Sequence, residues 1–118
     1  MFLHSVLRRI LVSVRLIPKP DFVGREALSP PTPEEVAPGE IVIVGERQYQ
    51  KWACFRCPGG CGEIILLSLN TTRHPSWQVF VDGLKRPTIS PSVRQINDCK
   101  CHFWVRQGRV DWCRDSGQ

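Results

Sequence analysis

The chain has 118 residues, six cysteines and a formal net charge of +5. This length leaves room for one domain, and a core that small usually needs a metal ion or disulfides for stability. A net charge of +5 is too small to indicate a nucleic-acid partner. Proteins that bind nucleic acids typically have lysines and arginines clustered on one surface.

Residues 1–17 (MFLHSVLRRILVSVRLI) are expected to form a basic amphipathic helix, because apolar residues recur at the three- and four-residue spacing of one helix face. Arg8, Arg9 and Arg15 interrupt the apolar run, so the segment fits neither a secretion signal nor a membrane-spanning helix. We therefore expect a cytoplasmic protein, in which clustered cysteines more often bind metal than form disulfides. The helix is expected to pack on the domain or on a partner, or to lie on a membrane surface.

Residues 18–39 are expected to form a Pro-rich, acidic connector. They contain six of the ten prolines and few large apolar residues. Because proline removes a backbone donor and breaks helices, this composition is typical of an extended chain. The sequence therefore predicts a helix tethered to the domain that follows.

Residues 40–114 are predicted to form a mainly β domain, followed by a short tail at residues 115–118. Short runs rich in β-branched and aromatic residues alternate with turn signals, and no long helical pattern follows residue 40. The fold class is therefore a small, zinc-stapled antiparallel β domain. The expected strands are Ile41–Val44, Lys51–Arg56, Ile64–Leu69, Trp77–Val81, Thr88–Ser90, Phe103–Arg106 and Arg109–Cys113.

Local patterns also predict turns and strand positions within this domain. Gln107-Gly108 is typical of a two-residue hairpin turn, because glycine accepts the positive φ that such turns need. The run Ile64–Leu67 is apolar on both faces, which predicts a central strand. Pro87 and Pro91 bracket a strand and predict an edge position for it, because proline cannot donate to a neighbour.

Two cysteine motifs predict a metal site. The first, Cys57-Pro58-Gly59-Gly60-Cys61-Gly62, is a tight turn in which backbone amides can point at two thiolates. The second, Cys99-Lys100-Cys101-His102, lies far downstream, and tetrahedral zinc commonly takes two ligands from each of two hairpins. The predicted Zn²⁺ ligands are Cys57, Cys61, Cys99 and His102.

Other ligands remain open within these motifs. In a straight strand Cys99 and Cys101 share one face and His102 takes the other, so Cys99 and His102 can meet at a metal only through a turn or bulge. Cys101 is therefore a rival ligand, as is Cys54 upstream. Cys113 is expected to be a core thiol, since free cysteine buries readily.

Glu63 lies two residues beyond Cys61 and is the candidate catalytic residue. A carboxylate beside the metal can act as general base towards a zinc-bound water. A full set of four ligands favours a structural ion instead, because a catalytic zinc keeps one position open. The segment Ser90-Pro91-Ser92 has no histidine or acid close in sequence that would mark a nucleophile.

The sequence resembles the bacterial domain-of-unknown-function family 6527 over most of residues 39–113. Many relatives have cysteine in place of Gly59 and serine in place of Cys101. The resemblance implies metal ligation at the four positions predicted above, with Glu63 as an adjacent acid. The stretches that carry it are Cys57–Glu63, Arg86–Val93, Cys99–Val105 and Gly108–Val110.

The same resemblance implies a role beside bacterial ubiquitin-like proteins and their activating and conjugating enzymes. The expected function is a zinc-dependent peptidase that matures a ubiquitin-like protein or removes it from conjugates. In that reaction zinc polarises the scissile carbonyl and activates a water, and Glu63 accepts the proton. The alternative is a non-catalytic protein-binding module of a ubiquitin-like conjugation pathway, in which the zinc is structural.

Overall fold

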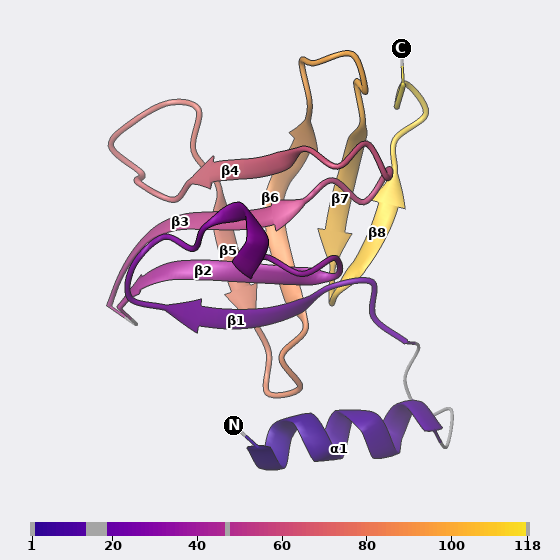
Figure 1. Cartoon of the computed structure of the whole chain (residues 1–118). Helices are drawn as coiled ribbons and strands as arrows, with labels where there is room; N and C mark the ends of the chain where they lie inside the picture. Colours follow the sequence, from indigo (N-terminus) through magenta and orange to yellow (C-terminus); the bar gives the residue numbers. More distant parts are fainter. Residues whose placement is uncertain (1, 14–18, 47, 118) are drawn as a thin grey trace.

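The computed structural model describes residues 2–13, 19–46 and 48–117, and in them two four-stranded sheets pack against each other with a helix beside them (Figure 1). The sheets have the strand orders β1-β2-β3-β4 and β5-β6-β7-β8. This architecture confirms the mainly β fold class. The elements are α1 (Phe2–Ser13), β1 (Val23–Ala27), the 3₁₀ helix η1 (Pro33–Glu35), β2 (Glu40–Glu46), β3 (Tyr49–Arg56), β4 (Ile64–Ser68), β5 (Gln78–Val81), β6 (Pro87–Arg94), β7 (His102–Arg106) and β8 (Arg109–Trp112).

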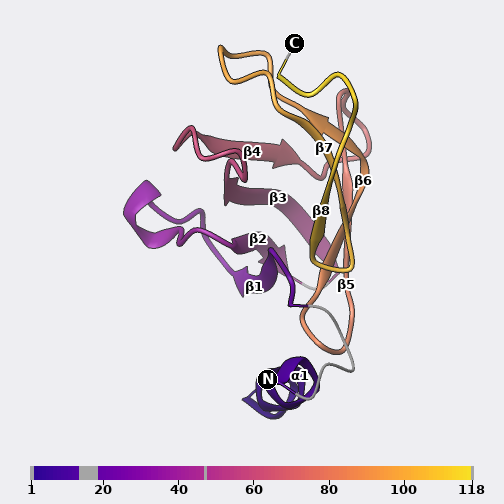
Figure 2. The same ribbon diagram turned by 90° about the vertical axis from the view of Figure 1, so that its right-hand side faces the viewer.

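The strands of one sheet run across those of the other, and the core lies between them (Figures 1 and 2). A row of edge-to-face aromatic rings crosses this core from the first sheet to the second. The ring centroids of Phe22 and Phe55 are 5.3 Å apart, those of Phe55 and Phe103 6.3 Å, and those of Phe103 and Trp112 5.6 Å. Edge-to-face pairs stabilise a core beyond the area they bury, so this row fixes how the two sheets sit together.

The connector expected at residues 18–39 contributes to the fold. Its β1 pairs in parallel with β2, and Gly24 lies so close to Val81 that a Cβ would come within 3.2 Å of that side chain. The segment between β1 and β2, which contains η1, covers the outer face of the first sheet, where Val36, Val42 and Cys54 are buried. The sequence did not predict β1, because a strand of composition VGREA has no apolar alternation.

Two predicted strand positions are wrong. β4 lies at the edge of its sheet, and Leu66 is exposed between the buried Ile65 and Leu67. β6 lies inside its sheet between β5 and β7, although it contains Pro91. An irregularity in the pairing of β6 with β7 surrounds this proline, and a bulge is one of the few places where a sheet tolerates proline. The Gln107-Gly108 hairpin is confirmed, with φ values of 49° and 78°.

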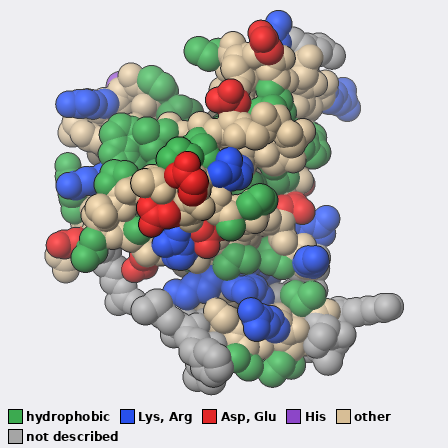
Figure 3. Space-filling model, viewed as in Figure 1, with side chains coloured by type: hydrophobic (Ala, Val, Ile, Leu, Met, Phe, Trp, Pro, Cys, Tyr) green, Lys and Arg blue, Asp and Glu red, His purple; other side chains and the backbone are tan. Residues whose placement is uncertain are grey.

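Helix α1 lies beside the first sheet, and the expected extension of this helix to residue 17 lies outside the described residues. The Arg8 guanidinium donates a hydrogen bond of 3.4 Å to the carbonyl oxygen of Leu84. Basic side chains gather where the helix meets the sheets (Figure 3). Within the described part of the chain, no helix combines the length and apolar character needed to cross a membrane.

Gly108 offers a test of how the β7–β8 turn holds the start of β1. Its carbonyl accepts hydrogen bonds from the amides of Asp21 and Phe22, and a Cβ on it would lie 2.8 Å from the Phe22 carbonyl oxygen. Gly108→Ala should therefore lower the free energy of unfolding by roughly 1–3 kcal/mol, measured by urea denaturation. The matched control is Gly117→Ala, which has a similar positive φ of 84° but no atom within 4 Å of the added carbon. Equal losses in both variants would contradict the steric argument.

Candidate active site and cysteine cluster

Ser92 lies where the pairing of β6 with β7 is irregular. From Ile89 to Val93 β6 advances by four residues, whereas the paired stretch of β7 from Val105 to Phe103 advances by two. The two extra residues form a bulge, and bulges re-aim side chains and recur beside active sites. The indole of Trp77 donates a hydrogen bond of 3.2 Å to the Ser92 carbonyl oxygen, which holds the bulge in place.

Ser92, His102 and Asp115 form a chain of hydrogen bonds. The Ser92 Oγ lies 3.0 Å from Nε2 of His102, the first residue of β7. The other ring nitrogen, Nδ1, lies 2.6 Å from Oδ1 of Asp115 in the turn after β8. Because a carboxylate can only accept, Nδ1 carries the hydrogen and Nε2 is free to accept the serine hydroxyl. This is the arrangement of nucleophile, base and orienting acid found in serine hydrolases.

Arg94 and Ser116 hold His102 and Asp115 in place. The Arg94 guanidinium forms an ion pair with Oδ2 of Asp115 and lies 3.0 Å from His102 Nδ1. The hydrogen bond from His102, followed by the one from Arg94, lowers the pKa of Asp115 below its ordinary value. Asp115 is therefore ionised at neutral pH, as an orienting acid must be. The Ser116 hydroxyl accepts a hydrogen bond of 3.0 Å from the His102 amide.

The two predicted cysteine motifs meet in space. The Sγ atoms of Cys57, Cys61 and Cys99 all lie within 4.8 Å of one another. The Sγ of Cys101 lies 3.6 Å from that of Cys57 and 2.9 Å from that of Cys99. Cys57 and Cys61 lie in the connection between β3 and β4, and Cys99 and Cys101 lie in the connection between β6 and β7. We call these four cysteines the four-sulfur cluster; Cys57, Cys61 and Cys99 are placed so that they could hold a metal ion, and Cys101 contacts two of them.

Burial and hydrogen bonding change the pKa values of these thiols in opposite directions. Burial raises the pKa of Cys57 and of Cys101, and hydrogen bonding to Cys101 raises the pKa of Cys99 to about 11. The backbone N–H of Glu63 lowers the pKa of Cys61. Sulfurs this close repel one another when they are all ionised, so without a cation the cluster keeps most of its protons. A divalent metal would remove this cost and release the protons.

Gly59 is required by the packing of the cluster. A Cβ on this residue would lie 2.5 Å from the Cys101 Sγ and 3.4 Å from the Cys57 Sγ. Real Cβ atoms do not approach sulfur so closely, so any side chain here would push the sulfurs apart. The amide of Gly59 also donates a hydrogen bond of 3.3 Å to the Cys57 Sγ.

The structure brings together three of the four predicted metal ligands, Cys57, Cys61 and Cys99. His102 does not join this group. Both of its ring nitrogens face the serine–histidine–aspartate chain instead. Consecutive strand residues point to opposite faces, so at the start of β7 Cys101 turns to the sulfurs and His102 turns to Ser92. The open alternative of Cys101 as ligand therefore fits the geometry better than His102.

The remaining candidates occupy other surroundings. Cys54 is buried on the outer face of the first sheet, and burial raises the pKa of its thiol. Glu63 is exposed and contacts the cluster through its backbone, whose carbonyl accepts a hydrogen bond of 2.9 Å from the Cys57 amide. Cys113 is only half-buried and lies beside His102 and Asp115 rather than in the core.

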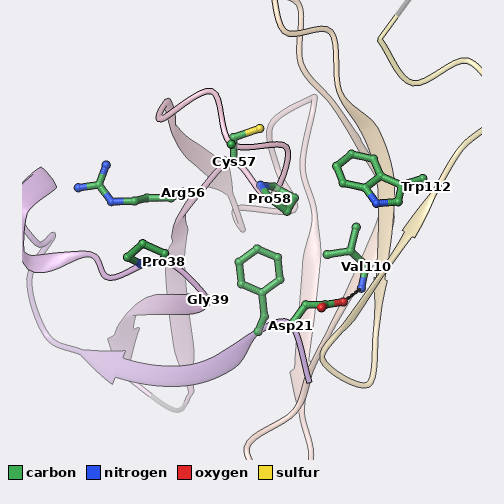
Figure 4. A pocket seen from close by; sticks show the side chains of 10 residues that line it. Asp21, Pro38, Gly39, Arg56, Cys57, Pro58, Val110 and Trp112 are labelled. Atoms are coloured by element: carbon green, nitrogen blue, oxygen red, sulfur yellow. Dashed lines mark hydrogen bonds between the residues drawn. The ribbon is translucent and has the colours of Figure 1, made fainter. Parts of the chain in front are cut away.

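A cavity of about 370 Å³ opens between the two sheets beside the four-sulfur cluster. In Figure 4 Trp112 faces the loop of Cys57 and Pro58 across this cavity, and Asp21 accepts a hydrogen bond of 2.8 Å from the Val110 amide. Its lining does not include the serine, histidine or aspartate of the hydrogen-bonded chain. The cavity therefore belongs to the junction of the sheets and not to that chain.

A family model described as "Bacterial ubiquitination-like system serine protease" (BubE) matches residues 28–113. Comparisons with curated proteins and with solved structures give no match. The family description confirms the expected link to a bacterial ubiquitin-like pathway and a protease, but it does not address the numbered family that the sequence resembles. The matched residues include Ser92 and His102, and Asp115 lies two positions beyond them.

This finding corrects the expected function. The zinc-dependent peptidase is wrong, because the family is one of serine proteases, and the role of Glu63 as base towards a zinc-bound water falls with it. The alternative of a non-catalytic binding module gains no support from the match. Since the matched segment spans well over half of the chain, the protein belongs to the bacterial ubiquitination-like system serine protease family, BubE.

Proposed function

We propose that the chain is a serine protease in which Ser92 is the nucleophile, His102 the general base and Asp115 the acid that orients the base. The observation that carries this proposal is the pair of contacts at His102, 3.0 Å to the Ser92 hydroxyl and 2.6 Å to the Asp115 carboxylate. The family description supports the same chemistry.

The geometry supports acyl transfer in two steps. Ser92 Oγ attacks the scissile carbonyl carbon while its proton passes to Nε2 of His102. The imidazolium then gives this proton to the leaving amine, the scissile C–N bond breaks, and an acyl-serine remains. A water, deprotonated by His102, attacks the ester and releases the acid and Ser92. Throughout, the Asp115 carboxylate accepts a hydrogen bond from Nδ1–H of His102 and stabilises the charged ring without taking the proton.

The proposed partner is a protein of the ubiquitination-like system, such as its ubiquitin-like modifier or a conjugate of it. The hydrogen-bonded chain lies on the outer face of the second sheet, away from the core residues Ile89 and Phe103. On the same face, Ser90 and Phe80 are exposed and Trp104 is half-buried. A solvent-facing sheet with aromatic side chains beside the nucleophile suits a protein substrate.

We also propose that Cys57, Cys61, Cys99 and Cys101 bind one structural Zn²⁺. Four thiolates are a ligand set that zinc prefers, and a closed set of four is typical of structural sites. All six cysteines are free, and their reduced state fits a cytoplasmic location. The ion would tie the turn after β3 to the connection between β6 and β7. That connection joins the strand of Ser92 to the strand of His102, so zinc would support the active site without taking part in the reaction.

Substitution of the nucleophile tests the protease proposal directly. Ser92→Ala should abolish covalent labelling by a fluorophosphonate probe, measured by intact-protein mass spectrometry, because the probe needs an activated hydroxyl. Ser90→Ala is the matched control, since Ser90 is an exposed serine on the same strand. It should label at the parent rate. Labelling that persists in Ser92→Ala, or is lost in Ser90→Ala, would refute the assignment.

Asp115→Asn tests the orienting acid. The amide can present its NH₂ to Nδ1 and favour the wrong tautomer of His102, so the labelling rate should fall by roughly 10²- to 10⁴-fold. Asp111→Asn is the control, because Asp111 forms an exposed ion pair of 2.9 Å with Arg106 on the same sheet. Its rate should stay within about twofold of the parent rate, as expected for a surface pair. Equal rates for the two variants would exclude a role for Asp115.

The zinc proposal is tested by Gly59→Ala, whose added methyl group must displace a ligand sulfur. The parent chain should purify with close to one equivalent of zinc, and a chelator should lower its melting temperature. Gly59→Ala should bind zinc about tenfold more weakly or worse. Gly83→Ala adds the same methyl group where no atom lies within 4 Å, so it should bind zinc as the parent does. A parent chain that binds no zinc would refute the site.

A further inference from the structure

A second group of metal-ligating atoms lies at the active site itself. A ring nitrogen of His102, the Sγ of Cys113 and a carboxylate oxygen of Asp115 all lie within 4.8 Å of one another. Cys113 follows β8 and sits beside His102 on the neighbouring strand, where its amide donates a hydrogen bond of 2.9 Å to the His102 carbonyl oxygen. The proposed reaction has no use for this thiol.

We propose that His102, Cys113 and Asp115 form an inhibitory site for a divalent transition metal, with Zn²⁺ as the best-matched ion. The proposal rests on the catalytic assignment of His102 and is independent of the four-sulfur cluster. One nitrogen, one sulfur and one oxygen are all ligands that zinc accepts. Mg²⁺ and Ca²⁺ prefer several oxygen ligands, and a single carboxylate beside a thiol does not provide them.

Binding at this site would stop catalysis through the tautomer of His102. The metal needs the lone pair of Nδ1, so the ring hydrogen moves from Nδ1 to Nε2 by exchange with solvent, and only the Cys113 thiol proton is lost to solvent. The neutral ring must then carry its hydrogen on Nε2. That nitrogen now donates towards Ser92 Oγ and can no longer accept the serine proton. Inhibition therefore needs no contact between the metal and the nucleophile.

Arg94 keeps this inhibition weak and reversible. Its guanidinium pairs with Asp115 and lies 3.0 Å from Nδ1, so it occupies the neighbourhood that the metal would enter. A metal ion must displace this cation and compete with its charge. With three protein ligands, the site should bind zinc more weakly than the four-sulfur cluster.

The test uses the full chain with the four-sulfur cluster already loaded by one equivalent of zinc. Added ZnCl₂ should slow fluorophosphonate labelling of Ser92, EDTA in an amount equal to the added zinc should restore it, and MgCl₂ should have no effect. Cys113→Ser should label at the parent rate without added zinc and should need about tenfold more zinc for half-inhibition. Cys54→Ala is the matched thiol control, because Cys54 is buried on the outer face of the first sheet, and it should respond as the parent does.

A readout without activity separates this inference from the protease proposal. Co²⁺ added to Ser92→Ala that already holds zinc should give a thiolate-to-cobalt absorption band, and Ser92→Ala/Cys113→Ser should not. If the parent chain fails to label but the band depends on Cys113, the protease proposal is wrong and the metal site stands. Equal zinc sensitivity of the parent and Cys113→Ser, or a cobalt band that does not need Cys113, would overturn the inference.

Discussion

The pairing of β6 with β7 is the constraint on which the rest of the molecule depends. It places Arg94 opposite His102 and leaves two extra residues of β6 to bring Ser92 to the same ring. The connection that closes this hairpin carries Cys99 and Cys101, so two of the four sulfurs share one supersecondary unit with Ser92 and His102. A change in the register of these two strands would separate Ser92 from His102 and move two sulfurs at once.

The alternation of side chains along a strand allows two different chemistries to lie next to each other. Cys101 and His102 are consecutive, yet one contacts the sulfurs of Cys57 and Cys99 and the other contacts Ser92 on the outer face. Phe103 then points back into the aromatic row of the core. Three adjacent residues thus contribute to the cysteine cluster, to the serine–histidine–aspartate chain and to the core. The rigid strand gives His102 a fixed position without help from a mobile loop.

Much of the fold could be predicted from sequence, whereas the catalytic group could not. Runs rich in β-branched and aromatic residues located seven of the eight strands, and the cysteine motifs located the sulfurs, because both signals are local. Ser92 could not be predicted as a nucleophile because no histidine or acid lies close to it in sequence. His102 comes beside it only through the pairing of β6 with β7 and the irregularity between Ile89 and Val93. Asp115 reaches the ring from a turn outside the regular strands, where no periodic pattern predicts a position.

The bulge of β6 also has consequences for sequence divergence within such a family. Loss of one residue between Ile89 and Val93 would move the side chains on one side of the deletion to the opposite face of the sheet. Either Ser92 would then point inward or Val93 would leave the core. Length changes there should be selected against, whereas the exposed loop at residues 71–75 lies outside the strands and can vary in length at less cost. Homologues are therefore best aligned from the serine–histidine spacing outward.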